Sequence, residues 1–168
     1  IKSLPESDWL EKVDVADPGF LNFSLKNSAL EKIVADVVEK GERYGSSDLG
    51  KDQKVLVEFI SANPTGPLTL GNGRGGFFGD TLANVLHFFG AKVHREYYIN
   101  DTGNQIDVLG KSILGEPDAP YTGAYIEEVR KHVQAKTAME AGESAAVYIM
   151  EEFIKKSVEK MKIDFDHW

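Results

Sequence analysis

The sequence contains no cysteine, which excludes disulfide bonds, thiol catalysis and cysteine-bound zinc sites. It also lacks any apolar run near the roughly 20 residues that a helix needs to span a bilayer. The N-terminal stretch has neither the basic nor the apolar region of a signal peptide. We therefore expect a cytoplasmic protein in a reducing compartment, with no membrane partner.

Positive charge is scarce: 19 Lys and Arg residues against 27 Asp and Glu residues give a net charge of −8. A protein that grips a nucleic-acid backbone usually carries a basic face, because each neutralised phosphate releases counterions. If RNA is a substrate, most of the grip must come from outside these 168 residues. The hydrophobic fraction of 42% is ordinary, and the length suits one domain plus part of another.

The N-terminal part has a pattern typical of a hairpin followed by a helix. Lys12–Ala16 and Leu21–Leu25 are expected to be short strands joined by a turn at Asp17-Pro18-Gly19. Ser28 and Glu31 have the spacing of a capping box, which predicts the start of a helix. The apolar positions of this helix recur at helical period: Leu30, Ile33, Val34, Val37 and Val38.

The polar stretch 46–54 is the expected domain boundary, which divides the chain into residues 1–50 and 51–168. Directly after it, Val55–Ile60 is a nearly all-apolar strand of the kind that is buried on both faces of a parallel sheet. The boundary thus separates a hairpin and helix from the start of an α/β arrangement.

A helix from about Gly73 to Phe89 follows, and Lys92–Ile99 is a second strand. A strand, a helix and a strand in this order form a βαβ unit with parallel strands. Two strands cannot cover themselves, so we expect further chain to extend the sheet. Apolar residues on one side of the helix are expected to face the core: Phe78, Leu82, Val85, Leu86 and Phe89. The aromatic cluster is most simply core as well: Phe77, Phe78, Phe88 and Phe89.

The rest of the chain is predicted to be helical. Asp101 or Thr102 could cap a helix that runs to about Leu114. A short helix at 125–134 and a longer amphipathic one at 144–161 are expected after it.

The loop after the first strand is the best candidate for a binding site. In open α/β sheets, ligands bind beyond the carboxyl ends of the strands, where helix N-termini favour anions. The run Ser61–Asn72 lies there, and its prolines and glycines give it a rigid path that lets a ligand approach the backbone. Thr69 and Asn72 offer a hydroxyl and an amide. The alternative is an ordinary loop in which Asn72 is only the N-cap of the helix.

Glu58 is unusual because a carboxylate in an apolar strand is costly to bury without a partner. It could meet a cationic ligand at the end of the strand. The alternative is an ion pair with a basic side chain of the same chain, and Arg74 and Arg95 are candidates.

Several of these segments together resemble the arginyl-tRNA synthetase family. The resemblance covers the chain from about Val13 onward. Within it, Pro18–Phe23 is similar to the end of that family's N-terminal domain. It is carried by Val57–Leu68, Gly71, Gly73-Arg74-Gly75, Gly79-Asp80, Leu82-Ala83, Arg95–Asp101, Gly103 and Gln105.

The resemblance implies an α/β fold: the first half of a Rossmann-like (HUP-type) nucleotide-binding fold with parallel strands and a helical insertion, preceded by the tail of an α+β domain. It implies that residues 1–50 end the additional tRNA-binding domain and that 51–168 begin the catalytic domain. The activity would be ATP-dependent activation of L-arginine and its transfer to tRNA(Arg), with Mg²⁺ carried by ATP.

The resemblance also implies a site. The catalytic residues would be Thr69, Gly71 and Asn72, at the position of the family's His-x-Gly-His motif. ATP would be bound by Pro67, Leu68, Thr69, Leu70, Gly71, Asn72 and Gly73. Arginine would be bound by Glu58, Ser61, Asn63 and Gln105.

The sequence departs from the family pattern because Thr69 and Asn72 replace both motif histidines. Each still offers a hydrogen bond, but neither can carry a positive charge near pH 7. We interpret the site as a variant that works with neutral donors rather than as a degenerate one, because Glu58, Asn63 and Gly71 are in place. This predicts an ATP affinity that varies little between pH 5.5 and 7.5, with no step near the histidine pKa of about 6.5.

The family's second motif, Lys-Met-Ser-Lys-Ser, has no counterpart here. Lys155-Lys156-Ser157 lies in a predicted amphipathic helix and is interpreted as its solvated face. The 168 residues alone are therefore expected to show no aminoacylation.

Three other functions were weighed. Gly71–Gly76 fits the dinucleotide-binding pattern G-x-G-x-x-G, but ten residues separate it from the strand that it should follow directly. A non-catalytic module that binds tRNA or arginine is also compatible with the sequence. The four histidines lack the i, i+4 spacing of metal ligands, so no protein-bound metal is expected.

Overall fold

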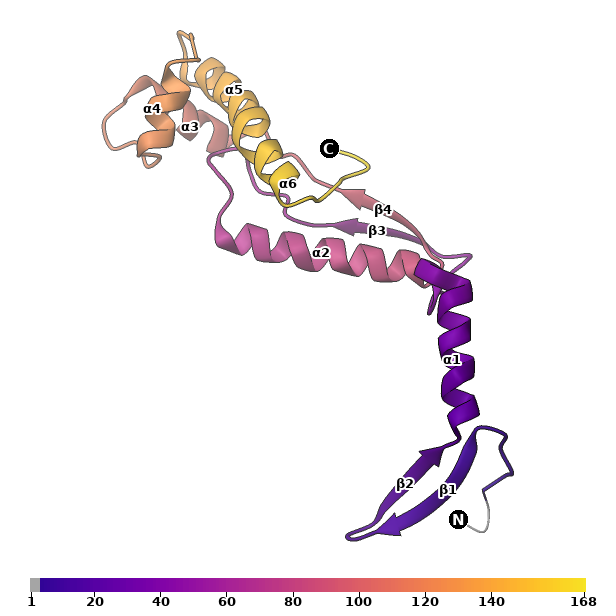
Figure 1. Ribbon diagram of the computed structural model, residues 1–168. Coiled ribbons are helices and arrows are strands. Elements are labelled where there is room, and N and C mark those ends of the chain that lie inside the picture. The colour runs from indigo at the N-terminus through magenta and orange to yellow at the C-terminus, as the bar shows by residue number, and fades with distance from the viewer. Residues whose placement is uncertain (1–3) are drawn as a thin grey trace. The chain divides into compact units, whose positions relative to one another are not determined.

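The computed structural model describes residues 4–168 (Figure 1). The chain forms two compact units, Ile1–Ser46 and Ser47–Trp168, which are described separately. Among the described residues, the helices are too short or too polar to cross a membrane.

The first unit is a β-hairpin followed by a helix. Strands β1 (Leu10–Ala16) and β2 (Phe20–Leu25) pair antiparallel, as predicted. The turn between them uses Gly19 at φ 131°, a backbone region that favours glycine. Helix α1 (Asn27–Lys40) ends in the 3₁₀ turn η1 (Gly41–Arg43). The predicted capping box at Ser28 is wrong: the helix starts at Asn27, so Ser28 already lies inside its first turn, and no side chain caps it.

The second unit begins with the predicted βαβ arrangement. Strand β3 (Lys54–Glu58), helix α2 (Leu70–Phe88) and strand β4 (Lys92–Glu96) follow one another. The strands are parallel and in register from Lys54 opposite Lys92 to Glu58 opposite Glu96, which confirms the prediction. Both strands are shorter at their carboxyl ends than predicted. Figure 1 shows α2 running alongside the two strands.

The C-terminal residues lie beside β4 and make one isolated parallel bridge to it. Glu96 and His167 form a parallel bridge, and the Tyr97 N–H donates to the His167 carbonyl at 3.0 Å. The N–H groups of Asp166 and His167 both donate to the Arg95 carbonyl. The sheet itself contains two strands, β3 and β4, among the described residues, so the expectation that further chain extends it stays a prediction.

Two predictions about burial in this part are wrong. Strand β3 is covered on one face only: Val57 is 9% exposed, whereas Leu56 is 58% exposed. Helix α2 buries its small residues, Gly76, Gly79 and Ala83, and turns its large ones outward. The side chains predicted to be core are partly or largely exposed: Phe77, Phe78, Leu82, Val85, Leu86, Phe88 and Phe89. The small residues let the helix backbone approach the sheet, and a Cβ on Gly79 would overlap the Phe59 ring.

The remaining residues form what we call the helical insertion, residues 104–160. It contains α3 (Asn104–Leu114), α4 (Ala124–Arg130), α5 (Ala138–Ile149), the π-helical turn η2 (Met150–Lys155) and α6 (Lys156–Lys160). Figure 1 shows α5, η2 and α6 as one long helix.

Two helix starts and one helix end in the insertion differ from the predicted ones. Helix α3 starts after Gly103 rather than at a side-chain cap from Asp101 or Thr102. Helix α4 ends earlier than predicted. Helix α5 starts well before residue 144, because Thr137 and Glu140 form a capping box that the sequence analysis missed.

Helices α3 and α5 cross at very close range to form the largest core cluster. A Cβ on Gly110 would overlap the Ala138 carbonyl, and a Cβ on Gly142 would overlap the Ile106 carbonyl. The crossing thus depends on backbone packed directly against backbone. The fully buried side chains of this core cluster include Ile106, Leu109, Ile126, Val129, Ile149 and Ile154.

Candidate functional site

The loop that follows β3, residues 59–69, is here called the site loop, and it leaves the strand through a sharp bend. Ile60 and Ser61 have φ values of 64° and 37°, which places two non-glycine residues in the left-handed region. This backbone is strained, above all for the β-branched Ile60, and such strain persists only where the surroundings impose it. The bend explains why the predicted strand Val55–Ile60 ends at Glu58.

A buried tyrosine fixes the loop just after the bend. The Tyr97 hydroxyl donates to the Ala62 carbonyl at 2.8 Å and accepts from the Ala62 N–H at 3.0 Å. Tyr97 is 1% exposed, and this burial raises the pKa of its hydroxyl to about 12. The next residue, Tyr98, donates its N–H to the Ser61 hydroxyl at 3.1 Å. The loop backbone is therefore held by the end of β4.

Two of the predicted arginine-binding residues meet each other. The Asn63 side-chain NH₂ donates to the Gln105 side-chain oxygen at 2.5 Å. Gln105 is the second residue of α3, so this contact joins the site loop to the helical insertion. Since each amide uses one group in this bond, the Asn63 oxygen and the Gln105 NH₂ stay available to a ligand.

Thr69 and Asn72 form a capping box at the start of α2, so Thr69 is the N-cap and the alternative of Asn72 as N-cap is wrong. The Asn72 N–H donates to the Thr69 hydroxyl oxygen at 3.3 Å, and the Thr69 N–H donates to the Asn72 side-chain oxygen at 2.9 Å. The Thr69 hydroxyl donates to the same oxygen at 2.7 Å. Thr69, Leu70 and Gly71 are exposed, which leaves this helix end open to solvent.

Glu58 is exposed rather than buried, so the burial argument that singled it out was wrong. Among the residues that the structure describes, no basic side chain lies within ion-pair distance of its carboxylate. Arg95 pairs with Asp80 instead, and Arg74 forms no ion pair with Glu58 among the described residues. Glu58 stands opposite Glu96 in the sheet register, so two carboxylates lie at the carboxyl end of the two strands. An exposed carboxylate here can meet a cationic ligand.

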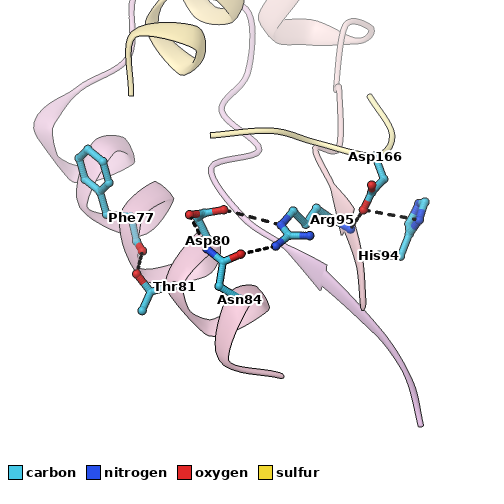
Figure 2. A network of polar contacts seen from close by, with 7 residues as sticks. All are labelled: Phe77, Asp80, Thr81, Asn84, His94, Arg95 and Asp166. Carbon is cyan, nitrogen blue, oxygen red and sulfur yellow. Dashed lines mark hydrogen bonds and ion pairs between the residues drawn. The ribbon is translucent and has the colours of Figure 1, made fainter. Parts of the chain in front are cut away.

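Figure 2 shows where Arg95 goes. Its guanidinium lies 3.6 Å from the Asp80 carboxylate and donates to the Asn84 side-chain oxygen at 2.6 Å. The Asn84 NH₂ in turn donates to Asp80. The backbone N–H of Arg95 donates to the Asp166 carboxylate at 2.7 Å, and Nδ1 of His94 lies 4.0 Å from the same carboxylate. The network ties α2 to β4 and to the C-terminal segment.

The structure thus brings Asn63 and Gln105 together, joins Ser61 to Tyr98, and places Thr69–Gly73 at the exposed start of α2. Glu58 closes β3 directly before the loop. Sequence reasoning missed Tyr97 and a second tyrosine, Tyr125, whose hydroxyl donates to the Thr65 carbonyl at 3.1 Å. No local pattern marks either residue, because their contacts span 35 and 60 residues.

A family model described as "tRNA synthetases class I (R), catalytic domain" matches residues 33–160. The chain belongs to the arginyl-tRNA synthetase family. Its α/β fold with a parallel sheet is that of the family's solved structures. The dinucleotide-binding alternative does not hold, because Gly71–Gly76 lies inside the first turns of α2 and not in a turn between strand and helix.

Curated arginine–tRNA ligases of this family are similar to nearly the whole chain. The ligase of Shouchella clausii is 40% identical over 95% of this chain and 33% of its own length. That of Halorhodospira halophila is 43% identical over 83% of this chain and 27% of its own length. The chain therefore spans about a third of the length of these relatives.

Solved structures of the family agree with the fold. An arginyl-tRNA synthetase structure from Campylobacter jejuni is 30% identical, with a TM-score of 0.74, over 85% of this chain and 36% of the other. The Thermus thermophilus enzyme is 24% identical with a TM-score of 0.53, over 96% of this chain and 27% of the other, which supports the fold alone.

Proposed function

We propose that this chain is the part of an arginine–tRNA ligase that binds ATP and L-arginine and joins them as arginyl-adenylate. The transfer of arginine to tRNA(Arg) would use the complete enzyme, with residues 1–50 ending a tRNA-binding domain and 51–168 beginning the catalytic domain. A cytoplasmic location belongs to the same proposal. The observation that carries it is one loop that joins the Asn63–Gln105 pair to the exposed N-terminus of α2, in a chain of this family.

ATP fits the start of α2. The first helical turn leaves the N–H groups of Leu70 and Gly71 without intrahelical acceptors, and the helix dipole favours phosphate there. A Cβ on Gly71 would meet only the Thr69 hydroxyl oxygen, at 3.5 Å, so packing within the described chain does not demand a glycine. A glycine at this place instead suits close approach of a ligand. Mg²⁺ would arrive with ATP, held mainly by phosphates and water.

The proposed ATP contacts are Pro67–Gly73, with Thr69, Gly71 and Asn72 nearest the chemistry. The capping box uses the oxygens of Thr69 and Asn72, which leaves the Asn72 NH₂ as a neutral donor for phosphate oxygens. Hydrogen bonds that strengthen as charge develops on the phosphates would stabilise the departure of pyrophosphate.

Arginine fits the groups at the end of β3. The Glu58 carboxylate is exposed and can pair with the guanidinium of the substrate, which favours two parallel hydrogen bonds. Asn63 and Gln105 retain an acceptor and a donor for the amino acid's own polar groups, and Ser61 lies two residues before Asn63 in the same loop.

The decisive test is aminoacylation by the complete product of the gene that encodes this sequence, with and without Glu58→Gln. We expect arginine-dependent charging of tRNA(Arg) and a rise of at least about tenfold in the KM for arginine in the variant, because a charge-assisted contact is lost. The KM for ATP should change little. An unchanged KM for arginine would remove Glu58 from the site, and no charging by the unsubstituted product would refute the ligase.

A non-catalytic module that binds tRNA or arginine is the second candidate, and the replacement of both motif histidines by Thr69 and Asn72 favours it. It predicts arginine or tRNA binding without turnover. The same charging assay separates the two, since binding with no charging would support the module.

A further inference from the structure

The site loop is held from two sides, and one side is the helical insertion. The Tyr125 hydroxyl, on α4, donates to the Thr65 carbonyl. Its ring lies against Gly66: a Cβ built there would be 3.3 Å from Tyr125 Cζ and 3.4 Å from its hydroxyl oxygen. Tyr125 is partly buried, and burial raises the pKa of its hydroxyl, so it is neutral and able to donate at physiological pH.

We propose that Tyr125 is a positioning residue for both substrates, through which the helical insertion sets the geometry of the site loop. The inference rests on the proposed function and names a determinant of it outside the nucleotide-binding fold. Thr65 and Gly66 lie between Asn63, proposed to bind arginine, and Pro67, where the proposed ATP contacts begin. Any movement of these two residues therefore shifts both halves of the site.

Other contacts also join the insertion to the site loop. Pro64 is buried and lines a small cavity of about 160 Å³ together with Met150 and Val147 of the insertion. The Asn63–Gln105 bond adds a further contact from α3. Tyr125 contacts the middle of the loop, at Thr65 and Gly66, and Leu68 packs against the core of the insertion nearer to α2. Misplacement of reacting groups by about 1 Å can lower a rate 100-fold, so a small shift here is enough to matter.

Two substitutions test the two contacts separately in the complete gene product. Tyr125→Phe keeps the ring and removes one neutral hydrogen bond, which predicts a three- to tenfold rise in the KM for arginine and for ATP, on the order of one such bond. Gly66→Ala pushes the loop from the ring and predicts a loss of roughly tenfold or more in kcat/KM. Tyr148→Phe is the matched control, because it removes a tyrosine hydroxyl from another part of the insertion. Tyr148 lies on α5, and its ring is stacked on that of His132 with 4.6 Å between the ring centroids.

The double variant, Tyr125→Phe with Gly66→Ala, decides whether the two contacts position the loop jointly. If Tyr125 and Gly66 position the loop together, the combined loss is smaller than the product of the single losses, because both changes disrupt the same contact. Independent losses that multiply would overturn the inference.

The remaining outcomes are distinct. If thermal stability falls in Tyr125→Phe while both KM values stay within twofold of those of Tyr148→Phe, Tyr125 is structural only and the inference is overturned. Wild-type charging with unchanged kinetics in Gly66→Ala overturns it too, and the ligase assignment stands. No charging by the unsubstituted product overturns the proposed function and this inference with it.

Discussion

Thr69 accepts a hydrogen bond from the Asn72 N–H and donates one to the Asn72 side chain, so a single threonine sets where α2 begins. Replacement of an N-cap threonine by alanine removes an acceptor that the first helical turn needs. We expect Thr69→Ala to lower the free energy of unfolding by about 1 kcal/mol, measured by urea denaturation. Thr69→Ser should retain most of it.

The control is Thr81→Ala, on the same helix, where the hydroxyl donates to the Phe77 carbonyl of an exposed turn. Its effect should stay within about 0.5 kcal/mol, because surface positions away from caps contribute little. Equal losses at positions 69 and 81 would contradict the capping role of Thr69.

The buried hydroxyl of Tyr97 makes the free energy of unfolding depend on pH in the alkaline range. Its pKa is raised by burial from 10.0 to about 12, so the folded state holds the proton more tightly than the unfolded state does. The contribution is complete below about pH 10 and is lost as the pH rises toward 12, because only the unfolded form ionises in that interval. We expect the free energy of unfolding to fall less steeply in Tyr97→Phe than in wild type across this range.

At neutral pH the same substitution should destabilise by roughly 1 to 2 kcal/mol, since the Ala62 N–H and carbonyl lose their partner. Urea unfolding at a series of pH values gives both quantities. Parallel curves for wild type and Tyr97→Phe above pH 10 would show that the hydroxyl is not protected.

At the scale of elements, the α3–α5 crossing is the least tolerant part of the molecule. A Cβ on Gly142 would overlap the Ile106 carbonyl, which is backbone and cannot rotate away. We expect Gly142→Ala to destabilise by about 2 kcal/mol or more, as overpacking does. Gly75→Ala is the opposite case: nothing lies within 4 Å of its Cβ position in α2, and alanine favours a helix, so stabilisation of up to about 1 kcal/mol is expected.

Thermal and urea unfolding of the two variants measure these opposite signs. Similar gains in stability in both would mean that helix propensity rather than backbone contact governs the glycines.

The order and type of the elements follow from periodicity, and so most helices and strands could be predicted. Burial could not be predicted so well. A helix with glycines on one face and phenylalanines on the other has the same sequence periodicity whichever face packs on the sheet. In α2 the face with the small residues is the buried one, and it packs against Phe59. The proposed site residues Thr69 and Asn72 could be found because their contacts are local, whereas Tyr97 and Tyr125 contact residues far along the chain.

At the scale of the whole molecule, binding and turnover are expected to separate. Lys155 and Lys156 form ion pairs with Glu151 and Glu152 one turn away. Lys156 is exposed, as predicted, whereas Lys155 is partly buried and lies over the Trp168 ring. The chain therefore offers no mobile lysine loop in this region to stabilise the transition state.

The 168 residues alone are expected to bind ATP in calorimetry but to transfer no arginine to tRNA. The control is the complete gene product under identical conditions. Robust charging by the isolated 168 residues would contradict this division of labour.

The parallel bridge between Glu96 and His167 has a consequence for how such a sheet can be extended. Strands β3, β4 and the C-terminal segment extend it in one direction, and within the described residues no strand pairs with the other edge of β3. A strand added at that edge would reverse the direction of winding. The reversal would open a crevice at the carboxyl end of β3, which is where such sheets receive their ligands. The strained bend at Ile60 and Ser61 would then form the floor of that crevice.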